Sequence, residues 1–253
     1  MSALYQIFTE KAPEKSLNWL KEVLSLENIS DLKVYFVMAH RFIEKQSELL
    51  VWGRILILKR IEELLSREEF RKTLESLYDQ AEIQEARAII IGLKEMNYPE
   101  DLVEIGRKAV RSNTGDIFDA FAFNNPYAQI YFDENSWNQL VLKCIFNLKS
   151  IHQIQGLRER SNQTLANILS DFAHERWAAG RKVPAQVWKL MIGHLNDHLL
   201  KDIYKLITEG DKEDQIAGYL VLREAVFIPA QQLFTSFNFP DERSEWNWKL
   251  LDY

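Results

Sequence analysis

The sequence predicts an all-α protein, built as an array of short antiparallel helix pairs that resembles the superhelix of helical-repeat proteins. Apolar residues recur at helical spacing along most of the 253 residues, and the period-two alternation typical of strands is nearly absent. Residues 85–96 and 214–225 both close an apolar run with Leu, a basic residue and Glu, as inner helices of a repeat do. Four prolines precede amphipathic runs, where a helix accepts proline best: Pro13, Pro99, Pro126 and Pro184.

Helices joined by short connections follow one another along the chain, which favours antiparallel neighbours. We expect them at residues 2–10, 13–26, 31–45, 48–65, 68–79, 82–96, 99–111, 126–131, 134–148, 162–179, 185–195, 197–208 and 213–226. No low-complexity linker divides the chain, so we expect a single all-helical domain over residues 1–253.

Two aromatic segments depart from the helical pattern. Residues 114–134 carry six Phe and Tyr side chains in an irregular stretch, and the tail 237–253 carries Trp246, Trp248 and Tyr253 with little helical signal. Such side chains cannot all stay in water. The tail should therefore dock on the helical body or bind a partner.

Composition excludes several classes of protein. The formal charge of −6, from 31 basic and 37 acidic residues, argues against a general affinity for nucleic acid. The single cysteine, Cys144, cannot form an intramolecular disulfide and fits a reducing compartment. The N-terminus lacks the pattern of a secretory signal, and the most apolar stretch, residues 49–58, is interrupted by Arg54 and too short to span a bilayer. We expect a soluble cytoplasmic protein.

Catalytic and metal-binding motifs are incomplete. His174 and Glu175 begin a zinc motif of the H-E-x-x-H type, but Ala178 stands where the second histidine is needed. His194 and His198 lie four residues apart, but a helix break is expected between them. There is no phosphate-binding glycine loop and no nucleophile elbow. We therefore expect no metal, no cofactor and no catalytic residue that the sequence can name.

Polar residues on apolar helix faces are more informative. Arg176 continues the apolar face of Leu165, Leu169 and Phe172, where a leucine is expected. It is either a buried clamp to the 119–138 segment, through Asp119, Asp133, Glu134 or Asn138, or an anion-binding residue at the floor of a cleft. We favour the clamp, because paired buried arginines are usually structural. Asn138 also falls on an apolar face, whereas Asn125, Asp133 and Asn162 precede helices as caps do.

Four segments, in order, resemble the EboA family of bacterial metabolite-traffic proteins: NNPYAQIYF (124–132), WNQLVLKCIF (137–146), GLRERSNQTLANIL (156–169) and HERWAAGRKVPAQVWKL (174–190). The family-like segment runs over residues 114–195, although Arg158 and Glu159 make it more charged than the family pattern. The resemblance implies an all-helical cytoplasmic protein encoded beside a UbiA-like membrane prenyltransferase and other proteins of one gene cluster. Together these are thought to support movement of a natural product or its precursor toward the cell envelope.

The polar residues and the family-like segments overlap, and they define a candidate ligand-binding set: Asn125, Tyr127, Asn138, Lys143, His174, Glu175, Arg176 and Arg181. Singly, several have simpler explanations. Tyr127 can be core with a satisfied hydroxyl, Lys143 can be solvated, and Glu175 can pair with Arg181 or Arg158 at the surface.

Three functional hypotheses remain. The favoured one is a non-catalytic scaffold or metabolite-binding protein with a cleft near residues 121–181; its partners would be a small-molecule metabolite and proteins of the same gene cluster, including the UbiA-like protein. The rival is an enzyme that uses Glu175 or His174 as general base, with Arg176 and Lys143 holding an anionic substrate. The third, a pure protein-interaction array, predicts an exposed apolar patch instead of a pocket.

Overall fold

The computed structural model describes residues 3–44, 47–239 and 241–251, and it contains helices and no strand within those ranges. The all-α fold class is confirmed. We expected one domain over residues 1–253, whereas the contacts divide the chain into two compact units, residues 1–136 and 137–253. The boundary falls in the first turn of the helix Glu134–Phe146, so no linker composition marks it in the sequence. We call the two parts unit 1 and unit 2.

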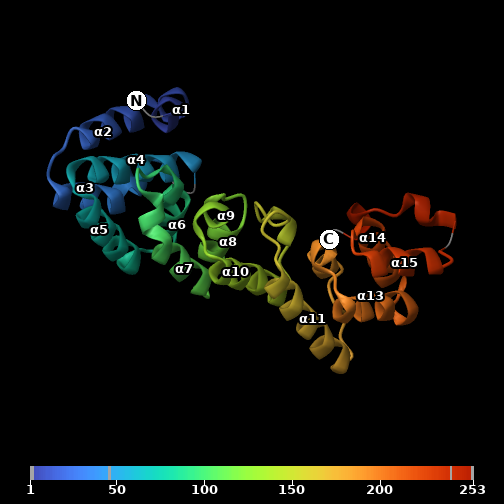
Figure 1. Cartoon of the computed structure of the whole chain (residues 1–253). Coiled ribbons are helices and arrows are strands. Elements are labelled where there is room, and N and C mark those ends of the chain that lie inside the picture. The colour runs from blue at the N-terminus through green and yellow to red at the C-terminus, as the bar shows by residue number, and fades with distance from the viewer. Residues whose placement is uncertain (1–2, 45–46, 240, 252–253) are drawn as a thin grey trace. The chain divides into compact units, whose positions relative to one another are not determined.

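Unit 1 is a set of short helices that run from the blue to the green part of the chain (Figure 1). They are α1 (Ala3–Lys11), α2 (Glu14–Leu24), α3 (Ile29–Met38), η1 (Ala39–Arg41), α4 (Glu48–Leu64), α5 (Arg67–Gln80), α6 (Ile83–Gly92), η2 (Leu93–Glu95), η3 (Pro99–Leu102), α7 (Val103–Arg111), α8 (Gly115–Ala122) and α9 (Tyr127–Tyr131), followed by the start of α10 (Glu134–Phe146).

Helix α4 forms the centre of unit 1, because α1, α2, α3 and α6 all pack against it. Its apolar residues are buried on nearly every side, including Ile55, Ile57 and Ile61. Gly53 allows α4 to pack closely against Ile43, because a Cβ atom at position 53 would lie 2.4 Å from the Ile43 side chain. Residues 53–58, in the middle of α4, are all buried, so this part of the helix has no solvated face for a charge. Arg54 therefore needs partners inside the unit.

Unit 2 continues α10 and ends at the described tail. Its further elements are η4 (Ile151–Gln153), α11 (Gln163–Ala178), α12 (Gln186–Lys189), η5 (Ile192–His194), α13 (Asp197–Glu209), α14 (Lys212–Glu224), α15 (Ile228–Ser236), η6 (Asp241–Glu245) and η7 (Trp248–Leu251).

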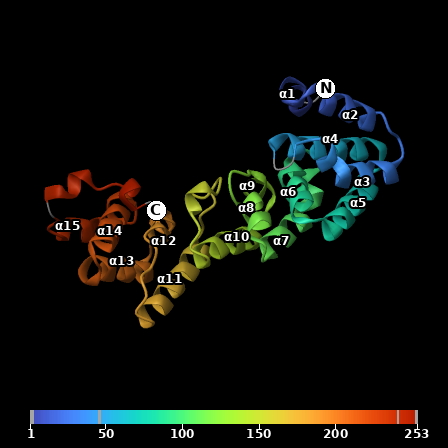
Figure 2. The same ribbon diagram turned by 180° about the vertical axis from the view of Figure 1, so that it is seen from behind.

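Helix α14 plays the central part in unit 2, since α12, α13, α15 and η7 pack against it (Figure 2). Gly218 permits the close approach of α13, because a Cβ atom there would lie 2.5 Å from Ile207. The tail packs on the same helix: the Trp246 ring meets Tyr219 edge-on at 5.2 Å and is 5% exposed. Leu251 is also buried, whereas Tyr253 lies outside the described residues.

Two helices differ from the expected pattern. Helix α8 lies in the stretch expected to be irregular, and α15 follows the last helix that we expected. Their sequences are apolar but short, and α8 begins at a glycine, so periodicity alone gives little signal. The sequence places the longer helices more closely. Helix α11, for example, begins directly after Asn162, whose side chain caps the helix by accepting a hydrogen bond from the Leu165 amide.

A helix that crosses a bilayer needs about 20 mostly apolar residues. The longest described helix, α4, has 17 residues and carries several charges. Among the residues that the structure describes, no helix is both long enough and apolar enough to cross a bilayer.

Candidate functional site

Unit 2 contains a pocket of about 560 Å³, which we call the large pocket. It is built by the irregular segment 151–161, by α12 and η5, and by the end of α14. Its walls include the buried side chains of Ile151, Ile154 and Leu190. Val226 also lines it and is 81% exposed. Small-molecule sites typically measure about 300–1,000 Å³ and combine apolar walls with a few polar groups.

Charged groups of both signs line the same pocket. His152, Arg158, Lys189 and His194 contribute basic groups, and Glu159 and Glu224 contribute carboxyl groups.

The tail fixes part of this wall. The Trp248 indole donates a hydrogen bond to Glu224 at 2.9 Å, and the Lys189 ammonium lies 5.6 Å from the centre of the Trp248 ring. The tail therefore supports the large pocket as well as covering the core, a contribution that its irregular sequence did not reveal.

Three of the sequence candidates are buried and hydrogen-bonded within the fold. Asn125 accepts a hydrogen bond from the Tyr127 amide, and the Tyr127 hydroxyl donates to the Pro99 carbonyl at 2.5 Å. Tyr127 is 0% exposed, so the interpretation as core with a satisfied hydroxyl is confirmed. Asn138 exchanges two side-chain hydrogen bonds with Asn162, at 3.2 and 2.8 Å. These contacts give all three residues a structural role.

The prediction that Arg176 bridges α11 to the 119–138 segment is wrong, because among the described residues its hydrogen bond goes to the Lys182 carbonyl. Arg176 is half-exposed in the last turn of α11, and its Nε donates to the Lys182 carbonyl, just beyond its own helix. The guanidinium also lies over the Phe172 ring, 5.5 Å from its centre. The buried face of α11 is formed by Leu165, Leu169 and Ala173 and by their neighbours, and it ends one turn before the helix does. Arg176 therefore has the angle of that buried face but lies beyond its last buried residue, Ala173.

The buried arginine clamp is Arg54, which the sequence showed only as an interruption of an apolar run. Arg54 is 2% exposed. It donates to the carbonyls of Phe36 and Val37, at 3.1 and 3.3 Å, and forms an ion pair with the buried Glu85 at 3.5 Å. Burial lowers the pKa of the guanidinium, and Glu85 opposes that shift. These contacts tie α4 to α3 and α6.

His174 belongs to a second polar cluster of unit 2. Its Nε2 lies 2.6 Å from one carboxyl oxygen of Asp202, and the other oxygen accepts a hydrogen bond from the Ser170 hydroxyl at 2.5 Å. Asp202 and Ser170 are buried, whereas the His174 side chain is 45% exposed. When Asp202 is ionised its oxygen only accepts, so this hydrogen bond requires a proton on the His174 Nε2. This cluster ties α11 to α13. No group of metal-binding side chains is found among the described residues.

The remaining candidates lie apart from the large pocket. Lys143 is half-buried on α10, and Glu175 and Arg181 are exposed. The expected ion pair of Glu175 with Arg181 or Arg158 is not formed among the described residues. Gly180, in the left-handed conformation at φ 64°, ends α11, so Arg181 is not on the helix that carries Glu175. Of the eight candidates, Arg176 alone lines one of the two larger pockets of unit 2.

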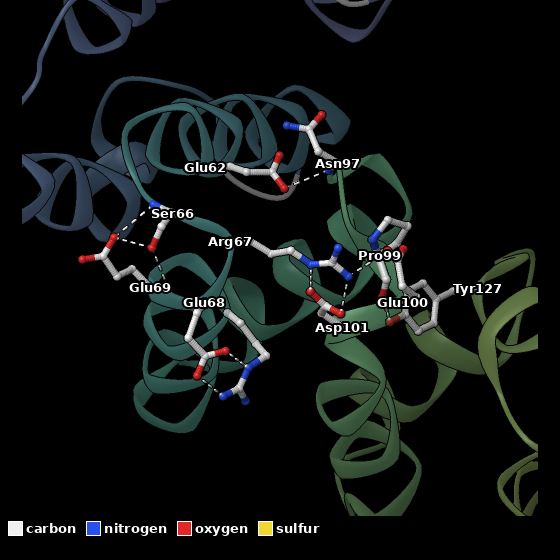
Figure 3. A network of polar contacts seen from close by, with 11 residues as sticks. Glu62, Ser66, Arg67, Glu68, Glu69, Asn97, Pro99, Glu100, Asp101 and Tyr127 are labelled. Carbon is white, nitrogen blue, oxygen red and sulfur yellow. Dashed lines mark hydrogen bonds and ion pairs between the residues drawn. The ribbon is translucent and has the colours of Figure 1, made fainter.

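Unit 1 has a polar network of its own, drawn in Figure 3. Arg67 of α5 pairs with Asp101 and, at 3.1 Å, with Glu100, which ties α5 to η3. Glu62 accepts a hydrogen bond from the Asn97 amide through one oxygen, while its buried Oε2 has no partner among the described residues. Burial raises the pKa of Glu62. The adjoining space of about 40 Å³ is too small for a metabolite.

Comparison with known proteins gives one match. The family model described as metabolite traffic protein EboA matches residues 19–192, more than half of the chain. The match begins well before the segment in which the sequence resemblance is concentrated and ends inside η5. No curated protein and no solved structure matches the chain.

Proposed function

Because this chain belongs to the EboA family of metabolite traffic proteins, we propose that it binds a small-molecule metabolite in the large pocket of unit 2 and releases it chemically unchanged. The observation that carries the proposal is the pocket itself, about 560 Å³ of concave space with apolar walls and a charged lining. That volume suits a molecule of metabolite or cofactor size.

The chemistry of the lining favours holding a molecule over transforming it. A general acid or base works at hydrogen-bond distance from the reacting atom, and it is usually oriented by a third group. His174, the residue with such an orienting carboxylate, does not line the large pocket. Glu224, which does line it, already accepts hydrogen bonds from Trp248 and Arg223.

The cellular role that we propose follows the family name and the resemblance. The bound molecule would be a natural product or its precursor, carried toward the cell envelope in the cytoplasm. The receiving partners would be proteins of the same gene cluster, including a UbiA-like membrane protein. This part of the proposal rests on the family alone.

A steric block of the large pocket tests the binding function. Gly193 lines the pocket, and a Cβ atom added there meets nothing within 4 Å. Gly193→Phe should therefore fold normally and occupy part of the pocket. Gly115→Phe is the matched control, because Gly115 is equally open and lies in unit 1.

The three proteins are incubated with a metabolite extract, washed, and analysed by mass spectrometry of the released molecules. The parent and Gly115→Phe should enrich the same compound, and Gly193→Phe should retain about a tenth of it or less. The compound should leave with the mass at which it entered. If no compound is enriched, or if the Gly193 variant enriches it as well as the parent does, the large pocket is not the binding site.

One observation favours an enzymatic alternative. Asp202 forms a hydrogen bond with Nε2 of the half-exposed His174 ring and so orients it, as a carboxylate does for a catalytic histidine. In this alternative His174 would act as general base on an anionic metabolite. A changed mass of the released compound that is abolished by His174→Gln would favour the enzyme and contradict simple carriage.

A further inference from the structure

A second pocket of unit 2 lies around Arg176, and we call it the Arg176 pocket. Its volume is about 290 Å³. It is lined by the end of α10, the last turn of α11, residues 182–187, Glu213 and the tail residue Leu251. Ile151 and Gln186 line this pocket and the large pocket alike. The two spaces therefore adjoin.

The cations of the Arg176 pocket differ in how they are neutralised. Lys182 forms ion pairs with Asp211 and Glu213, both at 2.7 Å. Its charge is therefore compensated by the protein. Arg176 forms no ion pair with a carboxylate among the described residues; its contacts are the Lys182 carbonyl and the Phe172 ring. Lys149 also lines the pocket.

The guanidinium of Arg176 is held in place and keeps donors available. The bond to the Lys182 carbonyl uses the Nε–H, and the guanidinium carbon lies over the Phe172 ring, 5.5 Å from its centre. An arginine has five N–H donors in a rigid fork, and the outer ones match the two oxygens of a carboxylate or phosphate. Because the group is already oriented, an incoming anion orders little more of the side chain.

An apolar surface lines the same pocket. Leu148 is 69% exposed and adopts the left-handed conformation at φ 53°, which costs a residue with a Cβ atom more than it costs glycine. The chain thus keeps a large apolar side chain where stability alone would favour glycine. Two residues earlier in the chain, Phe146 is 55% exposed and packs against Phe172 with the two rings tilted by 37°, and Arg176 lies over that Phe172 ring. Exposed apolar groups beside a cation suit a molecule that has both kinds of surface.

We infer that the Arg176 pocket binds the anionic group, a carboxylate or a phosphate, of an amphiphilic metabolite, with Arg176 as the anion contact and Leu148 against the apolar part. The inference rests on the proposed function and deepens it, because it names the chemical class of the ligand. Of the two roles that the sequence allows for Arg176, structural clamp and anion-binding residue, the inference assigns the second.

Calorimetric titration of the full chain with octyl phosphate tests the inference, with octanoate, inorganic phosphate and octanol as comparison probes. Octyl phosphate or octanoate should bind more tightly than either inorganic phosphate or octanol, because octyl phosphate and octanoate each combine an anionic group with an apolar chain. Arg176→Gln should weaken the preferred probe about tenfold or more. Arg181→Gln is the matched control, since Arg181 is exposed and lines neither pocket, and it should change the affinity less than about twofold.

Leu148→Gly separates the two halves of the site. It should weaken octyl phosphate and leave the weak binding of inorganic phosphate unchanged. If octyl phosphate and octanoate do not bind, or bind equally to the parent and to Arg176→Gln, the inference fails even where the extract experiment identifies a ligand in the large pocket. If Arg176→Gln abolishes binding but no compound is enriched from the extract, the anion site stands and the proposed function fails.

Discussion

Replacing Arg54 by methionine should destabilise unit 1 more than the same change at Arg176 destabilises unit 2. The Arg54 side chain donates hydrogen bonds to two carbonyls in the last turn of α3 and pairs with the buried carboxylate of Glu85. Methionine fills a similar volume but leaves a buried carboxylate without its cation. Breaking a buried pair in this way costs about 3–5 kcal/mol. Arg176→Met removes a half-exposed group with one carbonyl partner and should cost less than about 1 kcal/mol.

Two further variants show whether the stranded carboxylate causes the loss. Arg54→Lys keeps a charge but lacks the planar fork, so it should recover part of the stability. The double variant Arg54→Met with Glu85→Gln removes both charges and should recover more than half. Glutamine at position 85 keeps an acceptor for the Glu82 amide, which bonds to the Glu85 side chain at 3.2 Å.

Urea unfolding followed by circular dichroism measures the free energies, and hydrogen exchange in α3, α4 and α6 assigns the loss to unit 1. A loss below about 1 kcal/mol for Arg54→Met would refute the reasoning, because it would mean that water reaches Glu85 when the arginine is gone. Equal losses for Arg54→Met and Arg176→Met would refute the contrast between the two sites.

Three other predictions concern stability. Leu148→Gly should raise the free energy of unfolding by about 1 kcal/mol, because glycine adopts the left-handed conformation at φ 53° without strain and Leu148 buries little; a decrease in urea unfolding would contradict this. Tyr127→Phe should cost about 1–2 kcal/mol in a thermal melt, since it removes a buried hydrogen bond from the Tyr127 hydroxyl to the Pro99 carbonyl, whereas Tyr98→Phe, at a side chain 44% exposed, should be neutral. Burial and the Asp211 charge raise the pKa of Asp214 from 3.8 to about 6. The native state therefore binds the Asp214 proton more tightly than the unfolded chain does, and the stability gained from that proton is lost as pH rises from about 4 to 6. Asp214→Asn should therefore stabilise the protein by about 1–2 kcal/mol at pH 7 and have little effect at pH 3; an equal effect at both pH values would exclude the titration of Asp214 as its cause.

The sequence predicts the helices because each helix carries its own periodic pattern, and the pattern also gives the angle of a residue around the helix. It does not give the level along the helix at which a neighbour stops. Arg176 has the angle of a core residue but lies in the last turn of α11, beyond its last buried residue, whereas Arg54 lies mid-helix among buried neighbours. The pattern marked Arg176 as a misplaced charge and showed Arg54 only as an interruption of an apolar run, so only the packing identifies the buried arginine.

The large pocket could not be found from the sequence for a related reason. Part of its wall is the segment 151–161, which is mostly non-helical and has no period to interpret. Other parts come from residues far along the chain, such as Glu224 and Val226. The expected cleft near residues 121–181 therefore overlaps the pocket in the segment 151–161 only. A resemblance confined to short segments could not supply the rest.

The family match ends at residue 192, and this limit crosses the large pocket. One side of the pocket, from Ile151 to Ile192, falls within the match, whereas Gly193, His194, Glu224 and Val226 fall beyond it. The wall of the pocket is thus divided between a part that belongs to the matched family region and a part that the C-terminal residues supply. Under the proposed function, exchange of the C-terminal helices would change which compound the pocket accepts and leave the matched side as it is.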